Sequence, residues 1–137
     1  MRILFIGTGG IGVPVLQSLF QSAEHRVIGV VTQPDKPAGR RMELQHSPVK
    51  REALLRGVPV LQPLRMRSPE AVEEIRAAGA EVIVVMAYGQ ILPAAVLHAP
   101  STACLNLHAS LLPKQRGAAP IQAAIEAGEG ETGVTVM

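Results

Sequence analysis

The fold predicted for this chain is decided by residues 2–12, which read Arg2-Ile-Leu-Phe-Ile-Gly-Thr-Gly-Gly-Ile-Gly12. Residues 2–6 form a largely apolar run of strand length, as buried strands of parallel sheets do. The glycines that follow allow a tight turn, and the next segment has a helical apolar face made of Val15, Leu16, Leu19 and Phe20. A strand, a glycine turn and a helix in this order predict the first unit of an α/β sheet.

The same alternation continues along the chain. Apolar strands are predicted at residues 26–32, 58–61, 81–86, 102–107 and 132–137. Helices are predicted to begin at the pairs Ser47-Pro48 and Ser68-Pro69, which suit an N-cap and a first helical residue, and to end at Gly57 and Gly79. A last helix is predicted from Pro120 to Gly128, with Ile121, Ala124 and Ile125 as its buried face. These elements predict one α/β domain, residues 1–137, with a doubly wound, mostly parallel sheet.

The glycines at positions 7, 9 and 12 also match G-x-G-x-x-G, the pattern of dinucleotide-binding turns. A dinucleotide site also needs an acidic residue at the end of the second strand, to bind the ribose. Here the second strand ends in Thr32 and Gln33, and Asp35 lies beyond it in a proline-containing loop. A plain dinucleotide-binding module therefore remains an alternative prediction, and a tight turn without any ligand is the simpler one.

Composition limits the class of protein. The net charge is only +2, so a nucleic-acid binder is not indicated overall, although basic residues crowd between Lys36 and Arg51. The single cysteine, Cys104, excludes an internal disulfide and fits a reducing cytoplasm. No apolar run reaches the ~18 residues of a membrane span, and no signal-peptide cleavage pattern follows the first strand. We expect a soluble, cytoplasmic protein without a membrane partner.

Asn106 and His108 are the candidate catalytic residues. They lie on one face of the predicted strand, roughly 7 Å apart, so both could address one bound carbonyl group. An amide donor beside an imidazole at the end of a strand suits acyl transfer. A turn asparagine and a surface histidine are the simpler alternative. Cys104 and His108 are separated by roughly 13 Å along the strand, too far to bind one metal ion at about 2 Å, and no metal is expected.

The residues that follow Asn106 extend this pair to a long motif. Residues 106–120 read Asn-x-His-x-Ser-Leu-Leu-Pro-x-x-Arg-Gly-x-x-Pro, which resembles the signature of the folate-dependent formyltransferases. The resemblance implies a Rossmann-like fold and transfer of a formyl group from 10-formyltetrahydrofolate to a primary amine. It also implies that Asn106 and His108 polarise the formyl carbonyl and hold the tetrahedral intermediate.

The resemblance further implies a folate site built from two segments. These are the turn after residues 81–86, with Met86, Tyr88, Gly89, Ile91 and Leu92, and the segment Ser110, Leu111, Leu112 and Pro113. The first segment follows a strand at its carboxyl end, where open α/β sheets bind ligands. Backbone groups of this turn are expected to read the pterin ring, whereas the Tyr88 side chain alone would suit the edge of a core. One departure is the first turn, where Gly9 and Gly10 replace the usual proline and acidic residue of the family.

Residues 33–46 are predicted to be a basic surface loop. The segment Thr32-Gln-Pro-Asp-Lys-Pro-Ala-Gly-Arg40, which leads into this loop, resembles the loop with which some members of the family hold the acceptor end of initiator methionyl-tRNA. The resemblance implies that Lys36, Arg40 and Arg41 contact phosphates, which position a nucleic acid without reading its sequence. Family members that act on sugar nucleotides or glycinamide ribonucleotide share the catalytic motif but not this loop, and these amines remain alternative acceptors. A solvated surface loop is the simpler interpretation.

The resemblance also implies parts that follow the last predicted strand, residues 132–137. In the family that strand leads to a turn with a catalytic aspartate, and a C-terminal β-barrel domain that holds tRNA comes later. We therefore expect an incomplete N-terminal folate-binding domain, with its sheet truncated at the C-terminal end and no partner to orient His108. Such a chain is expected to be nearly inactive alone, or a binding fragment only, and to self-associate through residues 132–137.

Overall fold

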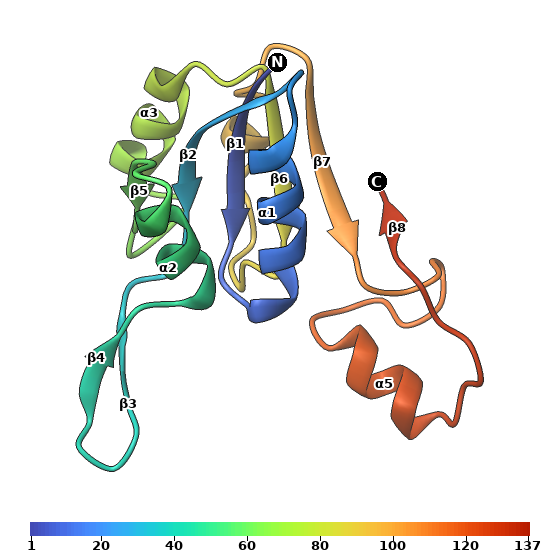
Figure 1. Ribbon diagram of the computed structural model, residues 1–137. Helices are drawn as coiled ribbons and strands as arrows, with labels where there is room; N and C mark the ends of the chain where they lie inside the picture. Colours follow the sequence, from blue (N-terminus) through green and yellow to red (C-terminus); the bar gives the residue numbers. More distant parts are fainter.

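The computed structural model describes residues 1–137, and its centre is one six-stranded sheet (Figure 1). The strand order is β5-β2-β1-β6-β7-β8. Their bounds are β1 Arg2–Gly7, β2 Arg26–Val31, β5 Val60–Leu61, β6 Val82–Met86, β7 Ala103–His108 and β8 Thr135–Val136. Every neighbouring pair is parallel except β7 and β8. The predicted doubly wound, mostly parallel sheet is therefore confirmed.

Helices cover both faces of this sheet. They are α1 Val13–Gln21, preceded by the 3-10 turn η1 Gly10–Gly12, then α2 Pro48–Leu55, α3 Pro69–Ala78 and α4 Ala94–Leu97. The last helix, α5 Pro120–Glu126, stands apart from both faces (Figure 1). Alternate residues of β1 enter two different cores, as the pleat of a strand requires. Phe5 packs with Leu16 of α1 and Val49 of α2, and Ile6 packs on the other face with Ile75 of α3.

The helix boundaries follow the predicted caps. The Ser47 hydroxyl accepts a hydrogen bond from Lys50 N at 3.0 Å, and the Ser68 hydroxyl accepts one from Ala71 N at 3.2 Å. Gly79 ends α3 in the left-handed conformation, with φ at 65°. Each Ser-Pro pair therefore begins a helix as the sequence predicts.

The glycine turn after β1 is set by close packing between strands. A Cβ atom on Gly7 would lie 2.6 Å from Met86 O and 2.7 Å from Phe5 Cε1, so no larger residue fits there. Thr8 N and Gly9 N both donate to Ala87 O, at 3.1 and 3.2 Å. The turn after β1 is thereby tied directly to the turn after β6.

Two predictions about single elements are wrong. Residues 33–46 are not only a loop, because β3 Lys36–Ala38 and β4 Glu43–Gln45 form an antiparallel hairpin that projects from the body (Figure 1). Left-handed conformations at Gly39 and Met42 turn the chain between the two strands. In α5, Ile121 and Ile125 are 39% and 73% exposed, and only Ala124 is buried. The helix stands apart from the sheet, near the end of β7 (Figure 1), so no strand covers Ile125.

Candidate active site

A pocket of about 660 Å³ opens at the carboxyl ends of β6 and β7. Its volume lies within the range of about 300–1,000 Å³ that is typical of small-molecule sites. Two segments of the candidate site meet there, Asn106 and His108 from β7 and the turn of residues 86–91 after β6. The lining also includes Ile11, Gly117, Ala118, Pro120, Ile121 and Gln122. An open α/β sheet is expected to bind ligands at this edge.

The pocket brings together six of the eleven predicted catalytic and folate-binding residues. Its lining includes Asn106 and His108 and the predicted folate residues Met86, Tyr88, Gly89 and Ile91. Leu92, Ser110, Leu111, Leu112 and Pro113 do not line it. Leu92 packs on the core between β6 and α3, and Ser110 is fully buried. Leu111 lines a separate shallow depression of about 490 Å³ with Lys114 and Glu129.

The segment from Ser110 to Pro113 forms a turn that ties β7 to β8. Ser110 Oγ donates to Lys114 O at 2.7 Å. Thr135 Oγ1 of β8 donates to Ser110 O at 2.7 Å and accepts from Leu112 N at 3.1 Å. These polar groups of the turn are therefore bound within the chain, and the turn does not line the pocket.

Asn106 and His108 are both half-buried at the pocket. The backbone of Asn106 is paired with Met137, with N···O distances of 2.8 and 3.0 Å, and its side-chain amide makes no hydrogen bond within the chain. His108 Nε2 lies 3.0 Å from Gln115 O. The expectation that nothing in this chain orients His108 is therefore wrong, because a backbone carbonyl from the following loop does so.

The turn after β6 presents its backbone to the pocket. Ala87 and Gly89 have φ values of 49° and 95°, and a Cβ atom at position 89 would lie 3.1 Å from Gln33 Nε2. Thr8 Oγ1 donates to Tyr88 O at 2.9 Å. The Tyr88 side chain, 3% exposed, points into the core with Ile6 and makes no hydrogen bond through its hydroxyl. Burial raises the pKa of Tyr88 to about 12.

Gln90 joins this turn to the segment that leads into the hairpin. Its Nε2 donates to Gln33 Oε1 at 2.9 Å, and its Oε1 accepts from Met66 N at 2.9 Å. Gln33 also receives support from Gln62, whose Nε2 donates to Gln33 O at 3.2 Å. A side-chain network therefore fixes the outer rim of the pocket wall.

The dinucleotide alternative finds little support in the first turn. A pyrophosphate would need free backbone N–H groups there, but Thr8 N and Gly9 N already donate to Ala87 O. Gly7 is required by the approach of Met86 O, without reference to any ligand. The turn contributes only Ile11 to the pocket lining.

The basic residues Lys36, Arg40 and Arg41 are exposed on the hairpin, which projects from the carboxyl edge of the sheet (Figure 1). Asp35 holds the base of this hairpin. Its carboxylate accepts from Lys50 Nζ at 2.7 Å, from Gln62 Nε2 at 3.0 Å and lies 3.1 Å from His46 Nδ1. The hydrogen bond from Lys50, helped by those from Gln62 and His46, lowers the pKa of Asp35 to about 2.

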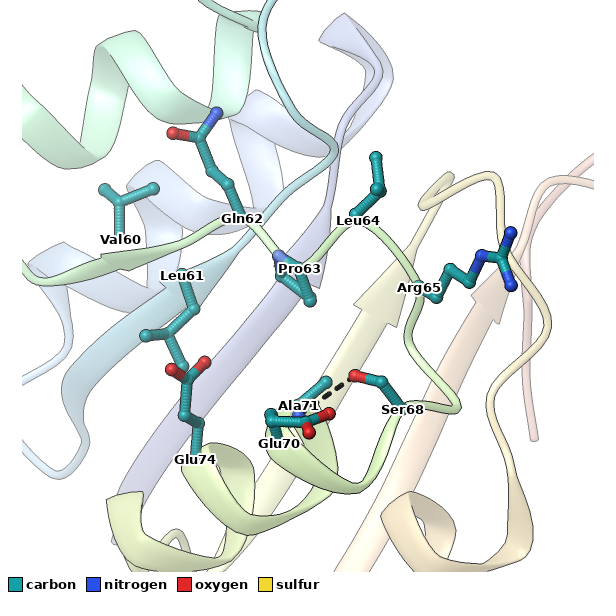
Figure 2. A pocket seen from close by; sticks show the side chains of 10 residues that line it. All are labelled: Val60, Leu61, Gln62, Pro63, Leu64, Arg65, Ser68, Glu70, Ala71 and Glu74. Carbon is teal, nitrogen blue, oxygen red and sulfur yellow. Dashed lines mark hydrogen bonds between the residues drawn. The ribbon is translucent and has the colours of Figure 1, made fainter.

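A second pocket, of about 530 Å³, lies between β5 and the start of α3 (Figure 2). Its charged side chains do not converge, since Arg65 points away from Glu70 and Glu74 (Figure 2). The hydroxyl of Ser68 is already bound to Ala71 N as the cap of α3. This pocket contains none of the predicted site residues.

Two general features complete the description of the site. The His, Cys, Asp and Glu side chains form no group of three or more that could hold a metal ion. None of the helices has the length and apolar character needed to cross a lipid bilayer. The fold and the pocket thus define the class: a doubly wound α/β protein with its candidate site at the carboxyl ends of the central strands.

The family described as formyl transferase matches residues 1–137, and the chain belongs to this family. It is 59% identical to the methionyl-tRNA formyltransferase of Xylella fastidiosa strain M23 over 137 residues, which cover 100% of this chain and 44% of the relative. It is 57% identical to the methionyl-tRNA formyltransferase of Sorangium cellulosum, of which it covers 43%. The chain therefore spans less than half the length of these relatives.

Solved structures share the fold. A phosphoribosylglycinamide formyltransferase from Bacillus halodurans matches with a TM-score of 0.78 and 22% identity, over 99% of this chain and 70% of the other. Glycinamide ribonucleotide transformylase 1 from Geobacillus kaustophilus matches with a TM-score of 0.75 and 26% identity, over 98% of this chain and 72% of the other. The fold is thus that of formyltransferases.

Proposed function

We propose that this chain binds 10-formyltetrahydrofolate and is the part of a methionyl-tRNA formyltransferase in which formyl transfer takes place. One observation carries the proposal, namely that a single pocket is lined both by Asn106 and His108 and by the turn of residues 86–91. The identity to methionyl-tRNA formyltransferases over the whole chain supports the choice of acceptor. We further propose that the protein acts in the cytoplasm, where Cys104 would stay reduced.

The pocket has room and chemistry for the pterin end of a reduced folate. Met86 and Ile91 supply apolar surface, and the left-handed residues Ala87 and Gly89 bend the chain along the pocket. Tyr88 contributes its backbone, since its ring is buried in the core. We assign Leu92 and the segment from Ser110 to Pro113 a structural role outside the pocket lining.

Asn106 and His108 would act on the formyl group. The lone pair of the methionyl amine forms a bond to the formyl carbon, and the C=O π pair moves to the oxygen, where Asn106 Nδ2 donates. His108 removes one proton from the attacking nitrogen and helps to stabilise the tetrahedral intermediate. The same proton then passes to the folate nitrogen as its bond to carbon breaks and the C=O bond re-forms. An α-amino group has a pKa near 8, so at neutral pH the amine must first be neutral to attack.

The hairpin would hold the acceptor end of the tRNA. Lys36, Arg40 and Arg41 are exposed cations on a projecting element, which suits contacts with phosphates. Asp35 and its partners keep the base of the hairpin fixed to the sheet. The cations would therefore be presented at the same edge as the pocket.

Calorimetric titration of the chain with a reduced folate and, separately, with NAD(H) tests the proposal. We expect saturable folate binding and no NAD(H) binding. NAD(H) binding without folate binding would reverse the choice between the two functions. Competition between methionyl-tRNA, glycinamide ribonucleotide and a sugar amine, in a full-length protein that carries this sequence, then identifies the acceptor.

A further inference from the structure

We infer that Gln115 and Glu129 are positioning residues, which hold His108 in the tautomer that carries its proton on Nε2 and so offer Nδ1 to the substrate. The catalytic meaning of this inference rests on the proposed function. The tautomer of the His108 ring does not depend on the proposed function and can be measured separately.

The contact between His108 and Gln115 defines the tautomer. His108 Nε2 lies 3.0 Å from Gln115 O, and a carbonyl oxygen can only accept a hydrogen bond. The proton must therefore be on Nε2, in both the neutral and the charged ring. Nδ1 makes no hydrogen bond within the chain and is not among the buried unpartnered atoms, so it is open to solvent at the pocket.

The position of the Gln115 carbonyl depends on the backbone conformation of Gln115 and on a contact of its side chain. Gln115 adopts a left-handed conformation with φ at 51°, which few residues other than glycine do without support. Its Nε2 donates to Glu129 Oε1 at 3.1 Å. Glu129 is itself fixed after α5, because its N–H donates to Ala124 O at 3.0 Å.

The loop between His108 and Gln115 is also held by hydrogen bonds within it. Ser110 N donates to His108 O at 2.8 Å, and Ser110 Oγ donates to Lys114 O at 2.7 Å. Lys114 Nζ lies 3.7 Å from Glu129 Oε2. These contacts bring Gln115 back beside the imidazole ring of His108. The carboxylate of Glu129 holds the loop through both Lys114 and Gln115.

The consequence for the reaction concerns one nitrogen atom. In the proposed transfer, Nδ1 is the atom whose lone pair takes the proton from the attacking amine and later gives it to the folate nitrogen. Nε2–H stays bound to Gln115 O throughout, so the ring neither rotates nor changes tautomer during a turnover. Without this bond the neutral ring would exchange between two tautomers, only one of which is productive.

Nitrogen-15 NMR of the 137-residue chain tests the inference. The His108 signals are assigned by comparison with His108→Asn, and exposed His98 serves as an internal reference. We expect a protonated Nε2, an unprotonated Nδ1 and an Hε2 proton protected from exchange with water. A neutral His108 with its proton on Nδ1 would overturn the inference.

Variants at position 129 test the anchor. In Glu129→Ala the Hε2 proton should exchange on the order of tenfold faster, which is the scale of one lost hydrogen bond. Glu129→Gln keeps an oxygen that can accept from Gln115 Nε2 and should retain the protection. Glu126→Ala removes an exposed carboxylate nearby and is the matched control. Equal exchange in the two alanine variants would exclude Glu129, and a chain with the expected spectrum that binds no folate would refute only the proposed function.

Discussion

At the scale of single residues, Asn106 offers the sharpest test of the proposed chemistry. In a full-length protein that carries this sequence, Asn106→Ala should lower turnover by about 100- to 1,000-fold, the usual effect of removing one donor to a developing oxyanion. Folate affinity should remain nearly unchanged, because the apolar lining and the turn after β6 are intact. Steady-state rates and calorimetry measure the two quantities. Gln17→Ala, which removes only a hydrogen bond to Glu52, is the control, and equal turnover in both variants would refute the role of Asn106.

Tyr88 offers a test of whether its side chain serves only the stability of the core while its backbone lines the pocket. Its buried hydroxyl has no partner, and an unsatisfied buried polar group is unfavourable. Tyr88→Phe should therefore raise the free energy of unfolding, by about 1 kcal/mol, and leave folate binding unchanged. Urea denaturation of the 137-residue chain measures this, and Tyr88→Leu, which leaves space in the core, should lower the same free energy. A clear loss of stability in Tyr88→Phe would show that the hydroxyl is bound.

At this scale the sequence predicts part of the pocket lining, because its signal is local. Asn106 and His108 lie on one face of a strand, and the turn of residues 86–91 follows a strand end, so both positions follow from strand geometry. Ile11 and Gln122 were missed, since they reach the pocket from distant segments. The partner of His108 was missed as well, because the carbonyl of Gln115 is a backbone group and carries no sequence signal.

At the scale of secondary structure, the hairpin shows where periodicity fails. Its strands are short and exposed, so they lack the alternation of apolar and polar residues by which strands are predicted. Tertiary contacts of Asp35 at its base support it instead. The wrong prediction for α5 has a related cause, because an apolar face indicates burial only where the chain supplies something to cover it.

The anchor of the hairpin should respond to pH. The pKa of Asp35 is about 2 in the folded chain and 3.8 without partners, so its contribution to stability is complete above the unfolded pKa and is lost as pH falls through the folded one. The free energy of unfolding should therefore fall more steeply between pH 4 and pH 2 in the unsubstituted chain than in Asp35→Asn. Urea denaturation at several pH values measures this. Parallel curves would show that the carboxylate contributes nothing.

The basic tip of the hairpin should respond to salt. In a full-length protein, Arg40→Ala should weaken tRNA binding and lower the slope of log affinity against log salt by roughly 0.7 to 0.9, because each phosphate contact releases counterions. Folate affinity should not change. Arg26→Ala, at the opposite end of β2, removes an equal charge and should leave the slope unaltered. The same slope in both variants would show that Arg40 makes no phosphate contact and that the hairpin is only a solvated surface.

At the scale of the whole molecule, the alternation of strands and helices predicts the class of fold and the layers on each face. It does not predict the strand order, which depends on which neighbours pack across the sheet. Nor does it predict that β8 runs antiparallel to β7, because two residues of strand carry no directional signal. The boundaries of helices are predicted best, since caps act within one turn.

The exposed edge of the sheet should determine association. β8 is an edge strand, and Val134, Val136 and Met137 are 51%, 59% and 63% exposed. We expect the 137-residue chain to form dimers or larger species as its concentration rises, because such an edge pairs with another chain. Val136→Lys should reduce this association, whereas Glu131→Lys, on the neighbouring exposed loop, should reduce it much less. Sedimentation velocity distinguishes these cases, and a monomer at all concentrations would contradict the prediction.

Gly7 has a consequence for how sequences of this kind are searched. Glycine is needed at position 7 because the backbones of β1 and β6 approach closely there. The glycine therefore reflects the distance between two strands and not an affinity for phosphate. A search with G-x-G-x-x-G alone would therefore retrieve this chain, although its turn amides are bound within the protein. In this chain Met86 O excludes a side chain at position 7 and Ala87 O binds the amides of Thr8 and Gly9, so the fingerprint is a signature of packing.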